Sequence, residues 1–258
     1  MNGAQPPTTH RLYDDLVWLW PILSDPAHYR GEAASFRDAI RGHATIPTHT
    51  LLDLGCGGGH NDSHLKADFK VTGVDLSAGM LEHARRLNPE ATYIQADLRM
   101  VRLGASFDAV IIADAIDYML TEADLAAAFA TAHAHLRPGG VFCTYAEYTR
   151  EHFVQNRNKC LTRSQGDVAL TFLENAYDPD ASDTTFEATF VCLIRERGRL
   201  RIETDRGLLG LFDLPTWRRL LSAAGFEVVE TRLDDEDEPP IPMFVCIKPF
   251  SPEKSILS

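Results

Sequence analysis

The sequence predicts an α/β fold in which a mainly parallel sheet is covered by helices on both faces. From residue 50 onward, short apolar runs alternate with helical segments, as in successive βαβ units. A glycine-rich turn follows the first apolar run, and an aspartate ends the second. The chain has 258 residues, and one domain of that length can bury a large core.

The first part of the chain is expected to form short helices that precede the sheet. Residues 1–9 are polar and proline-rich, so we expect no regular structure there. Two amphipathic helices are predicted at about 10–19 and 26–42, separated by Pro21 and Pro26. The aromatic side chains of this region would either fasten the helices to the core or form a lid over a pocket.

The core segment, residues 48–150, contains five predicted strands and the helices between them. The strands are expected at 50–54, 71–74, 92–95, 107–113 and 141–146. The helices are expected at 60–67, 78–87 and 122–136. Ser77 and Thr121 are suited to cap the second and third helices, because their hydroxyls can accept a backbone N–H.

The alternation of strands and helices lapses after the fifth strand. Residues 185–205 are predicted to form two β segments joined near Arg197-Gly198, where the glycine suits a tight turn. These segments would form a β hairpin inserted into the fold, within a region that spans residues 151–205.

The last part of the chain, residues 206–258, is expected to complete the sheet. A helix at 215–224 is followed by strands at 226–231 and 241–247. Asp234–Glu238 is predicted to form an acidic loop between those strands. Since no linker or internal repeat divides the chain, we predict one domain in which residues 1–47 form an N-terminal helical lid.

The composition excludes several classes of partner and location. The formal net charge is −12, which repels phosphate backbones, so nucleic acid is a poor partner. The densest basic cluster places an arginine at every second position, as on the solvent face of a strand. Its members are Arg195, Arg197, Arg199 and Arg201. No apolar run approaches the length of a membrane span or signal peptide. The five cysteines form no Cys-x-x-Cys pair, as expected of reduced thiols in a soluble, cytoplasmic protein.

The most informative motif is Asp53-Leu54-Gly55-Cys56-Gly57-Gly58-Gly59, between a predicted strand and a predicted helix. Glycine lets the backbone approach a ligand closely, and the following helix N-terminus favours negatively polarised groups. Asp75 ends the second strand, twenty residues after Gly55, and can accept two hydrogen bonds from a ribose diol. The motif therefore predicts a ligand that contains a nucleoside.

Two features distinguish this site from that of a dinucleotide dehydrogenase. His60 occupies the position at which the G-x-G-x-x-G motif needs its last glycine. Asp97 follows the third strand, where its carboxylate can accept a hydrogen bond from an adenine amino group. An NAD-dependent oxidoreductase is therefore the weaker alternative.

Five segments of the core resemble the successive motifs of class I S-adenosylmethionine-dependent methyltransferases. They are Leu51–Gly59, Val74–Ser77, Ala96–Leu98, Phe107–Val110 and Leu136–Gly140. They occur in the family's order and at its usual spacings, and residues 206–248 add a weaker match. The resemblance implies a Rossmann-like, seven-stranded mixed sheet whose last strand is antiparallel and lies beside the fifth. It also implies S-adenosyl-L-methionine as the cofactor.

The resemblance carries cofactor-binding roles to matching positions. The loop glycines would pass beneath the methionine part of the cofactor, and Asp75 would hold the ribose hydroxyls. Asp97 would bind the adenine amine beside the backbone of Leu98, and Asp114 would face the sulfonium. The full expected set is Tyr13, Tyr29, Asp53, Gly55, Gly57, Gly59, Asp75, Leu76, Met80, Asp97, Leu98 and Asp114.

Some of these positions also have a purely structural interpretation. Asp114 could be a solvated loop acid, and Met80 could belong to the core. Tyr13 and Tyr29 match the family's cofactor-covering aromatics only loosely. Arg30 could pair with the cofactor carboxylate, but a surface position on a helix is the favoured interpretation.

Missing motifs favour a small-molecule acceptor that is methylated at N or O. The turn Asp114–Tyr118 lacks the Asn/Asp-Pro-Pro-aromatic motif of enzymes that methylate the exocyclic amines of bases. The paired glutamates of protein-arginine methyltransferases are not evident either. The layout is similar to amino-sugar and secondary-metabolite N-methyltransferases, in which added β segments shape the acceptor pocket or a dimer interface. A homodimer is therefore a possible assembly.

Tyr118 and Glu147 are the predicted catalytic residues, since they follow the fourth and fifth strands at the ligand-binding edge of the sheet. The other candidate bases are His60, Asp117, Tyr148 and His152. Asp114 and Glu147 could together hold Mg²⁺, but Glu147-Tyr148 departs from the Asp-Asn pair of metal-dependent O-methyltransferases. We therefore predict no metal, and a catalytically inactive cofactor-binding protein remains an alternative.

Overall fold

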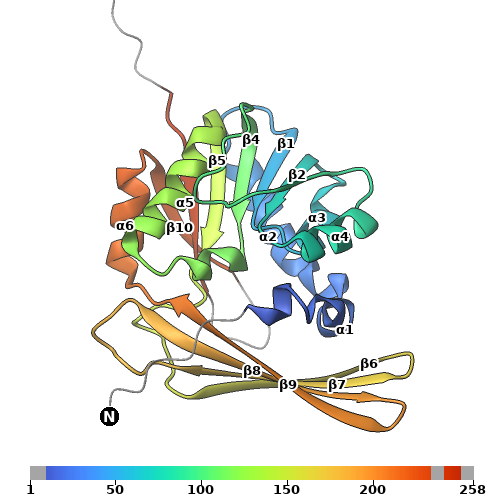
Figure 1. Cartoon of the computed structure of the whole chain (residues 1–258). Helices are drawn as coiled ribbons and strands as arrows, with labels where there is room; N and C mark the ends of the chain where they lie inside the picture. Colours follow the sequence, from blue (N-terminus) through green and yellow to red (C-terminus); the bar gives the residue numbers. More distant parts are fainter. Residues whose placement is uncertain (1–9, 234–240, 251–258) are drawn as a thin grey trace, which may run out of the picture.

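Two β-sheets organise the chain, one mixed and one antiparallel, with the N-terminal helices between them (Figure 1). The computed structural model describes residues 10–233 and 241–250. The larger sheet has seven strands in the order β10-β11-β5-β4-β1-β2-β3, and the smaller has four in the order β6-β7-β8-β9.

The seven-stranded sheet is mixed, as predicted. Its strands are β1 (Thr50–Leu54), β2 (Lys70–Asp75), β3 (Thr92–Gln95), β4 (Phe107–Ile112), β5 (Leu136–Tyr145), β10 (Glu227–Leu233) and β11 (Ile241–Ile247). Strands β1 to β5 pair in parallel, and β11 runs antiparallel to β5 and β10, between them. Every residue of β4 is buried, as expected for a strand covered on both faces. The Rossmann-like, seven-stranded prediction is confirmed.

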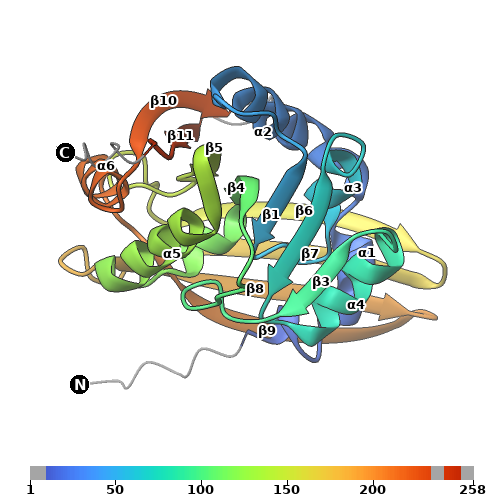
Figure 2. The ribbon, with the colours of Figure 1, turned by 90° about the horizontal axis from the view of Figure 1, so that it is seen from above.

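Helices cover both faces of this sheet (Figure 2). They are α2 (Arg30–His43), α3 (His60–Leu65), α4 (Ala78–Leu87), α5 (Glu122–His135) and α6 (Leu214–Ala223). Apolar side chains of α2 and α3 bury one face, and those of α5 and α6 bury the other. The predicted caps are present, since Ser77 Oγ accepts from Met80 N and Thr121 Oγ1 accepts from Asp124 N, both at 3.1 Å.

The inserted region is a four-stranded sheet, larger than the predicted hairpin. Its strands are β6 (Arg157–Gln165), β7 (Val168–Tyr177), β8 (Thr185–Glu196) and β9 (Arg199–Gly210). The predicted turn at Arg197-Gly198 is correct, with both residues at positive φ. The predicted boundary at residue 205 is wrong, because β9 continues to Gly210. Strands β6 and β7 were both missed, and β6 is an edge strand with a polar sequence and mostly exposed side chains.

The N-terminal segment, which we define as residues 10–29, differs from the predicted helix at 10–19. It forms 3₁₀ turns at Arg11–Tyr13 and Val17–Leu19, followed by α1 (Trp20–Leu23). Pro21 lies in the first turn of α1, where its missing N–H costs no hydrogen bond. The predicted helix at 26–42 is present, as a 3₁₀ turn that leads into α2.

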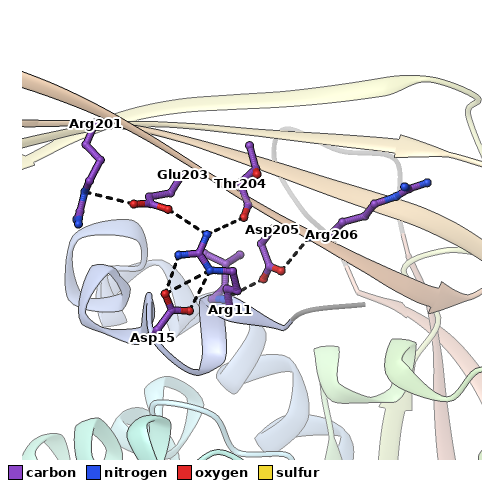
Figure 3. A network of polar contacts seen from close by, with 8 residues as sticks. Arg11, Asp15, Arg201, Glu203, Thr204, Asp205 and Arg206 are labelled. Atoms are coloured by element: carbon purple, nitrogen blue, oxygen red, sulfur yellow. Dashed lines mark hydrogen bonds and ion pairs between the residues drawn. The ribbon is translucent and has the colours of Figure 1, made fainter. Parts of the chain in front are cut away.

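The N-terminal segment is fastened to the inner face of the four-stranded sheet (Figure 3). The Arg11 guanidinium donates to Glu203 at 3.0 Å, and Asp205 accepts from the backbone N–H of Leu12 at 2.9 Å. Apolar side chains of the segment pack on the same face; they are Leu12, Leu16, Leu19 and Ile22. The segment therefore lies between the two sheets (Figure 1).

The predicted arginine face is spread over two strands and a turn. Arg195 belongs to β8, Arg197 to the turn, and Arg199 and Arg201 to β9. All four are exposed, and the Arg201 guanidinium lies 5.5 Å from the centre of the Trp18 ring.

The cysteines and the helix lengths can be compared with the expectations from composition. Four of the five cysteines are buried, Cys160 is exposed, and all five are free. Within residues 10–233 and 241–250, no helix is long and apolar enough to cross a membrane. The predicted acidic loop Asp234–Glu238 lies outside the described residues.

Candidate active site

A cavity of about 860 Å³ opens at the carboxyl ends of β1, β2 and β4, under the N-terminal segment. Its wall contains every predicted site residue except Gly59 and Glu147. The wall also contains residues that the motifs did not indicate, which include Trp20, Asn61 and Arg99. Ligands of parallel α/β sheets bind at this edge, because the loops after the strands converge there.

The glycine loop has two separate structural roles. Gly55 has φ +87°, and a Cβ at this position would overlap the Cβ of Ala115 in the turn after β4. Only glycine therefore lets β1 end against that turn and leaves the cavity open. Gly59 has φ +74° and faces away from the cavity, where a Cβ would lie 2.7 Å from Asn88 Nδ2. Gly59 thus serves the packing of α3 rather than the cavity wall.

Asp75 joins the loops that follow β1 and β2. Its Oδ2 accepts from Gly57 N and its Oδ1 from Ser77 N, both at 2.8 Å. Burial raises the pKa of Asp75, and these backbone donors act against that rise. A carboxylate has further lone pairs beyond those two bonds, so it can still accept from ligand hydroxyls.

Asp97 lies at the edge of the cavity in an ion pair that the motifs did not predict. Arg99 donates to its carboxylate at 2.7 Å and to Asp124 at 2.8 Å. The guanidinium lowers the pKa of Asp97, so the acid stays ionised. The pair fixes the carboxylate where the adenine amine was expected.

An aromatic wall encloses the middle of the cavity. The Tyr118 hydroxyl donates to the Tyr13 hydroxyl at 2.7 Å, and the two rings meet edge to face. Burial raises the pKa of both phenols, so both stay protonated at neutral pH. Tyr118 can therefore orient a ligand through hydrogen bonds, but it is not an ionised base.

A second aromatic group, Trp20, Tyr29 and His60, closes the end of the cavity near α3. His60 Nδ1 lies 3.1 Å from Ser24 Oγ, which shares a 2.9 Å hydrogen bond with the Tyr29 hydroxyl. Trp20 stacks on His60 with 6.1 Å between ring centres. Burial lowers the pKa of His60 to about 4, so the imidazole is neutral. Arg30 is exposed outside this cavity, which favours its structural interpretation.

Acidic side chains gather where β4 and β5 end. Asp114 lines the cavity with its side chain open to it, and the surrounding protein raises the pKa of this acid by desolvation. It accepts a hydrogen bond from the Tyr145 hydroxyl. Glu147 is outside the wall and pairs with Lys159 of β6 at 2.9 Å. Lys159 comes from a strand that the sequence did not predict, which is why this pair was missed.

Of the other candidate bases, His60 lines the cavity, whereas Asp117, Tyr148 and His152 do not. Asp117 is buried, and burial together with the charges of Glu147 and Asp114 raises its pKa well above the ordinary value. Tyr148 donates to Glu174 at 3.3 Å, and His152 is exposed beside Thr149. In the described part of the chain, no group of three or more His, Cys, Asp or Glu side chains is arranged to hold a metal ion.

Comparison with known proteins identifies the class. A methyltransferase domain model matches residues 51–140. The chain is 32% identical to dTDP-3-amino-3,4,6-trideoxy-alpha-D-glucopyranose N,N-dimethyltransferase of Streptomyces venezuelae, over 78% of this chain and 84% of that protein. The chain therefore belongs to the S-adenosylmethionine-dependent methyltransferases, as a class I enzyme of the small-molecule type.

Two further relatives are also similar along most of the chain. It is 31% identical to dTDP-3-amino-3,6-dideoxy-alpha-D-glucopyranose N,N-dimethyltransferase of Streptomyces fradiae, over 78% of each chain. The crystal structure of Streptomyces venezuelae DesVI aligns with a TM-score of 0.78 and 25% identity, over 95% of this chain and all of that one.

The cavity fits the cofactor of this family. Gly55 leaves a cradle that a side chain would fill, and Asp75 lies between two loops with lone pairs to spare. Three buried polar atoms of wall residues have no hydrogen-bond partner, namely Trp20 Nε1, Asp53 Oδ1 and Asn61 Oδ1. An unpaired buried donor and acceptor suit the carboxylate and ammonium of an amino acid.

Proposed function

We propose that this chain transfers methyl groups from S-adenosyl-L-methionine to the amino group of a small, sugar-like acceptor. The observation that carries the proposal is one continuous cavity. It runs from Asp75 and Asp97 to a wall formed by Asp114, Tyr118 and Leu208, the last from β9 of the inserted sheet. The relatives named above are N,N-dimethyltransferases of amino sugars, which supports an amine acceptor.

The geometry of the cavity supports a set of cofactor-binding roles. We assign the ribose hydroxyls to Asp75 and the adenine amine to Asp97, with Leu98 and Met80 against the base. The amino-acid end would lie against the aromatic group that includes Tyr29, near Asp53. S-adenosylmethionine supplies an activated methyl group, so the protein has to align the acceptor and exclude water.

An amine acceptor suits the chemistry of the wall better than a hydroxyl acceptor. A neutral amine attacks without prior ionisation, whereas an alcohol needs a base to remove its proton. The phenols of Tyr13 and Tyr118 are held protonated, so they can donate to the acceptor but cannot serve as strong bases. The Asp114 carboxylate faces the cavity and can attract an ammonium and take up its proton.

The two predicted catalytic residues receive different roles in this proposal. Tyr118 lies in the wall and would orient the acceptor through its hydroxyl. Glu147 lies behind the wall and would act through its charge, paired with Lys159. Neither role requires a nucleophile, since the methyl group passes directly from donor to acceptor.

The proposal can be tested with paired acceptors. The purified chain is incubated with S-adenosylmethionine and either a dTDP-linked amino sugar or its hydroxyl analogue. The masses of the products are then measured by mass spectrometry. We expect one or two added methyl groups on the amine and none on the hydroxyl analogue. The proposal would be overturned if only the hydroxyl analogue were methylated. It would also be overturned if the chain bound the cofactor but methylated no amine.

We also propose that the chain forms a homodimer through the outer face of the four-stranded sheet. Leu193 and Ile202 are paired across β8 and β9 on that face, and they are 37% and 58% exposed. Leu200 is 47% exposed on the same face. Exposed apolar patches of this kind mark interfaces. Light scattering should report a dimer for the native chain and a monomer for the Leu193→Lys/Ile202→Lys variant.

The proposed setting is the cytoplasm, without a nucleic-acid partner. The free and mostly buried thiols suit a reducing compartment. The formal net charge of −12 weakens any approach to a phosphate backbone.

A further inference from the structure

Two wall residues that the sequence motifs did not indicate carry buried polar atoms with no hydrogen-bond partner among the described residues. They are Trp20, whose indole Nε1 has no acceptor, and Asn61, whose amide Oδ1 has no donor. Buried polar atoms are nearly always satisfied, by the protein, by water or by a ligand. A donor and an acceptor in the wall of one cavity therefore indicate a ligand that carries both kinds of polar group.

Close packing holds the indole of Trp20 against the glycine loop. Trp20 begins α1 in the N-terminal segment, and its ring stacks on that of His60. A Cβ on Gly58 would lie 2.8 Å from Trp20 Nε1, so a side chain at this position would displace the indole. Glycine at position 58 thus admits the indole and places its N–H beside the loop.

Glu32 of α2 fixes the orientation of the Asn61 amide. Glu32 Oε1 accepts from Asn61 Nδ2 at 2.6 Å. Glu32 does not line the cavity, so this bond turns the amide nitrogen away from the cavity and leaves the oxygen on its side. Asp53, just before the glycine loop, adds a second unpartnered oxygen to the same wall.

We propose that Trp20 and Asn61 recognise the amino-acid end of the cofactor, Trp20 by donating to its carboxylate and Asn61 by accepting from its ammonium group. Glu32 is then a positioning residue, since it acts by orienting Asn61. An ammonium group has three N–H donors for the oxygens of Asn61 and Asp53, and a carboxylate can only accept, which suits the indole. The inference rests on the cofactor placement proposed above, and no part of it depends on the amine acceptor.

The first experiment measures affinities by calorimetry, without any acceptor. The ligands are S-adenosylhomocysteine, its analogue without the carboxylate and its analogue without the ammonium group. Trp20→Phe should weaken S-adenosylhomocysteine about tenfold and leave the analogue without the carboxylate at its native affinity. Asn61→Ser should also weaken S-adenosylhomocysteine about tenfold, but it should leave the analogue without the ammonium group at its native affinity.

Trp18→Phe is the matched control for this experiment, because Trp18 belongs to the same segment but is exposed. It should leave all three affinities at their native values. If Trp20→Phe weakens the analogue without the carboxylate as much as S-adenosylhomocysteine, the indole only packs the wall and the proposal is wrong. Equal native affinities for the three ligands would also contradict the inference, while cofactor binding itself would stand.

The second experiment tests Glu32 with the same ligands. Glu32→Ala should weaken S-adenosylhomocysteine about as much as Asn61→Ser does, because the amide is no longer held, and it should leave the analogue without the ammonium group unchanged. Glu32→Gln keeps an oxygen that can accept from the amide, so it should restore most of the native affinity. If Glu32→Gln and Glu32→Ala lose the same affinity, Glu32 acts through its charge and is not a positioning residue. If Glu32→Ala weakens all ligands alike, Glu32 only supports the fold.

Discussion

The seven-stranded sheet presents the ends of its strands to ligands, whereas the four-stranded sheet presents its face. Most residues that we assign to the cofactor lie at the ends of β1, β2 and β3 or shortly after them, so their positions follow from where each strand stops. The acceptor side depends on side chains brought together from separate elements, such as Leu208 of β9 and Tyr13 of the N-terminal segment. Local motifs therefore define one half of the cavity, and long-range packing defines the other.

The largest effect on cofactor affinity is expected at Gly55, where the wall leaves no space for a side chain. Gly55→Val should reduce S-adenosylhomocysteine affinity by roughly a hundredfold or more, because the new side chain overlaps Ala115 at a positive φ. Calorimetry measures the affinity. Gly104→Val is the matched control, since Gly104 also has positive φ but has nothing within 4 Å of a built Cβ. Equal losses in both variants would mean that backbone strain, not the cradle, explains the result.

A smaller loss is expected when the ribose contact is removed. Asp75→Ala should weaken S-adenosylhomocysteine binding at least about tenfold, because ligand hydroxyls lose a charged acceptor and two loops lose their link. Asp68→Ala, at a surface ion pair with Arg41, should leave the affinity unchanged. An unchanged affinity for Asp75→Ala would remove the central cofactor assignment.

A change on the acceptor side of the cavity is expected to alter acceptor binding and to leave cofactor binding unchanged. Tyr118→Phe should raise the KM for the amine about threefold to tenfold and leave S-adenosylhomocysteine affinity unchanged, because it removes one hydroxyl from the wall. Steady-state kinetics and calorimetry measure the two quantities. If Tyr118→Phe lowers the cofactor affinity by the same factor by which it raises the KM, the two halves of the cavity do not bind their ligands independently.

The contact between the N-terminal segment and β9 should affect stability. Asp205→Ala leaves the buried N–H of Leu12 without its acceptor, at a cost of about 1–3 kcal/mol. Thermal unfolding should show a lower Tm, and Asp183→Ala in the exposed loop before β8 serves as the comparison. An unaltered Tm would mean that the apolar contacts alone hold the segment.

The smallest effect is expected for the pH dependence of stability, through His60. The folded pKa of His60, about 4, lies below the ordinary value of 6.5, so the unfolded chain binds a proton that the folded chain does not. His60 therefore stabilises the fold above pH 6.5, and this contribution is lost as the pH falls toward 4. Denaturant unfolding should show a shallower acid loss for His60→Gln than for the native chain. Parallel pH curves would contradict this assignment.

The sequence predicted most of the cavity wall that we assign to the cofactor, because those residues mark the ends of regular elements. Asp75 ends β2, Ser77 caps α4, and the glycine loop separates β1 from α3. Gly59 was assigned to the wall by the same motif, but its surroundings turn it toward Asn88. A motif therefore gives the position in the chain more reliably than the direction that each residue faces.

The rest could not be predicted because it depends on partners distant in the sequence. Glu147 was expected to face the acceptor, but Lys159 of the polar edge strand β6 binds it behind the wall. Asn61 gave no signal either, since it meets Glu32 of α2 only in the folded chain, where its Nδ2 donates to the Glu32 carboxylate at 2.6 Å. Hydrophobic periodicity carries no information about such polar pairs.

The N-terminal segment is held on two sides through the adjacent residues Leu12 and Tyr13, and this has a kinetic consequence. Ser77 Oγ donates to the Tyr13 carbonyl at 2.5 Å, while the neighbouring Leu12 is bound to Asp205 across the cavity. One short stretch of chain thus lies over the cavity, and we expect it to detach from one of these contacts when S-adenosylhomocysteine is exchanged for a new donor. Exchange, rather than bond formation, is then expected to decide whether a singly modified product departs or waits for a second round.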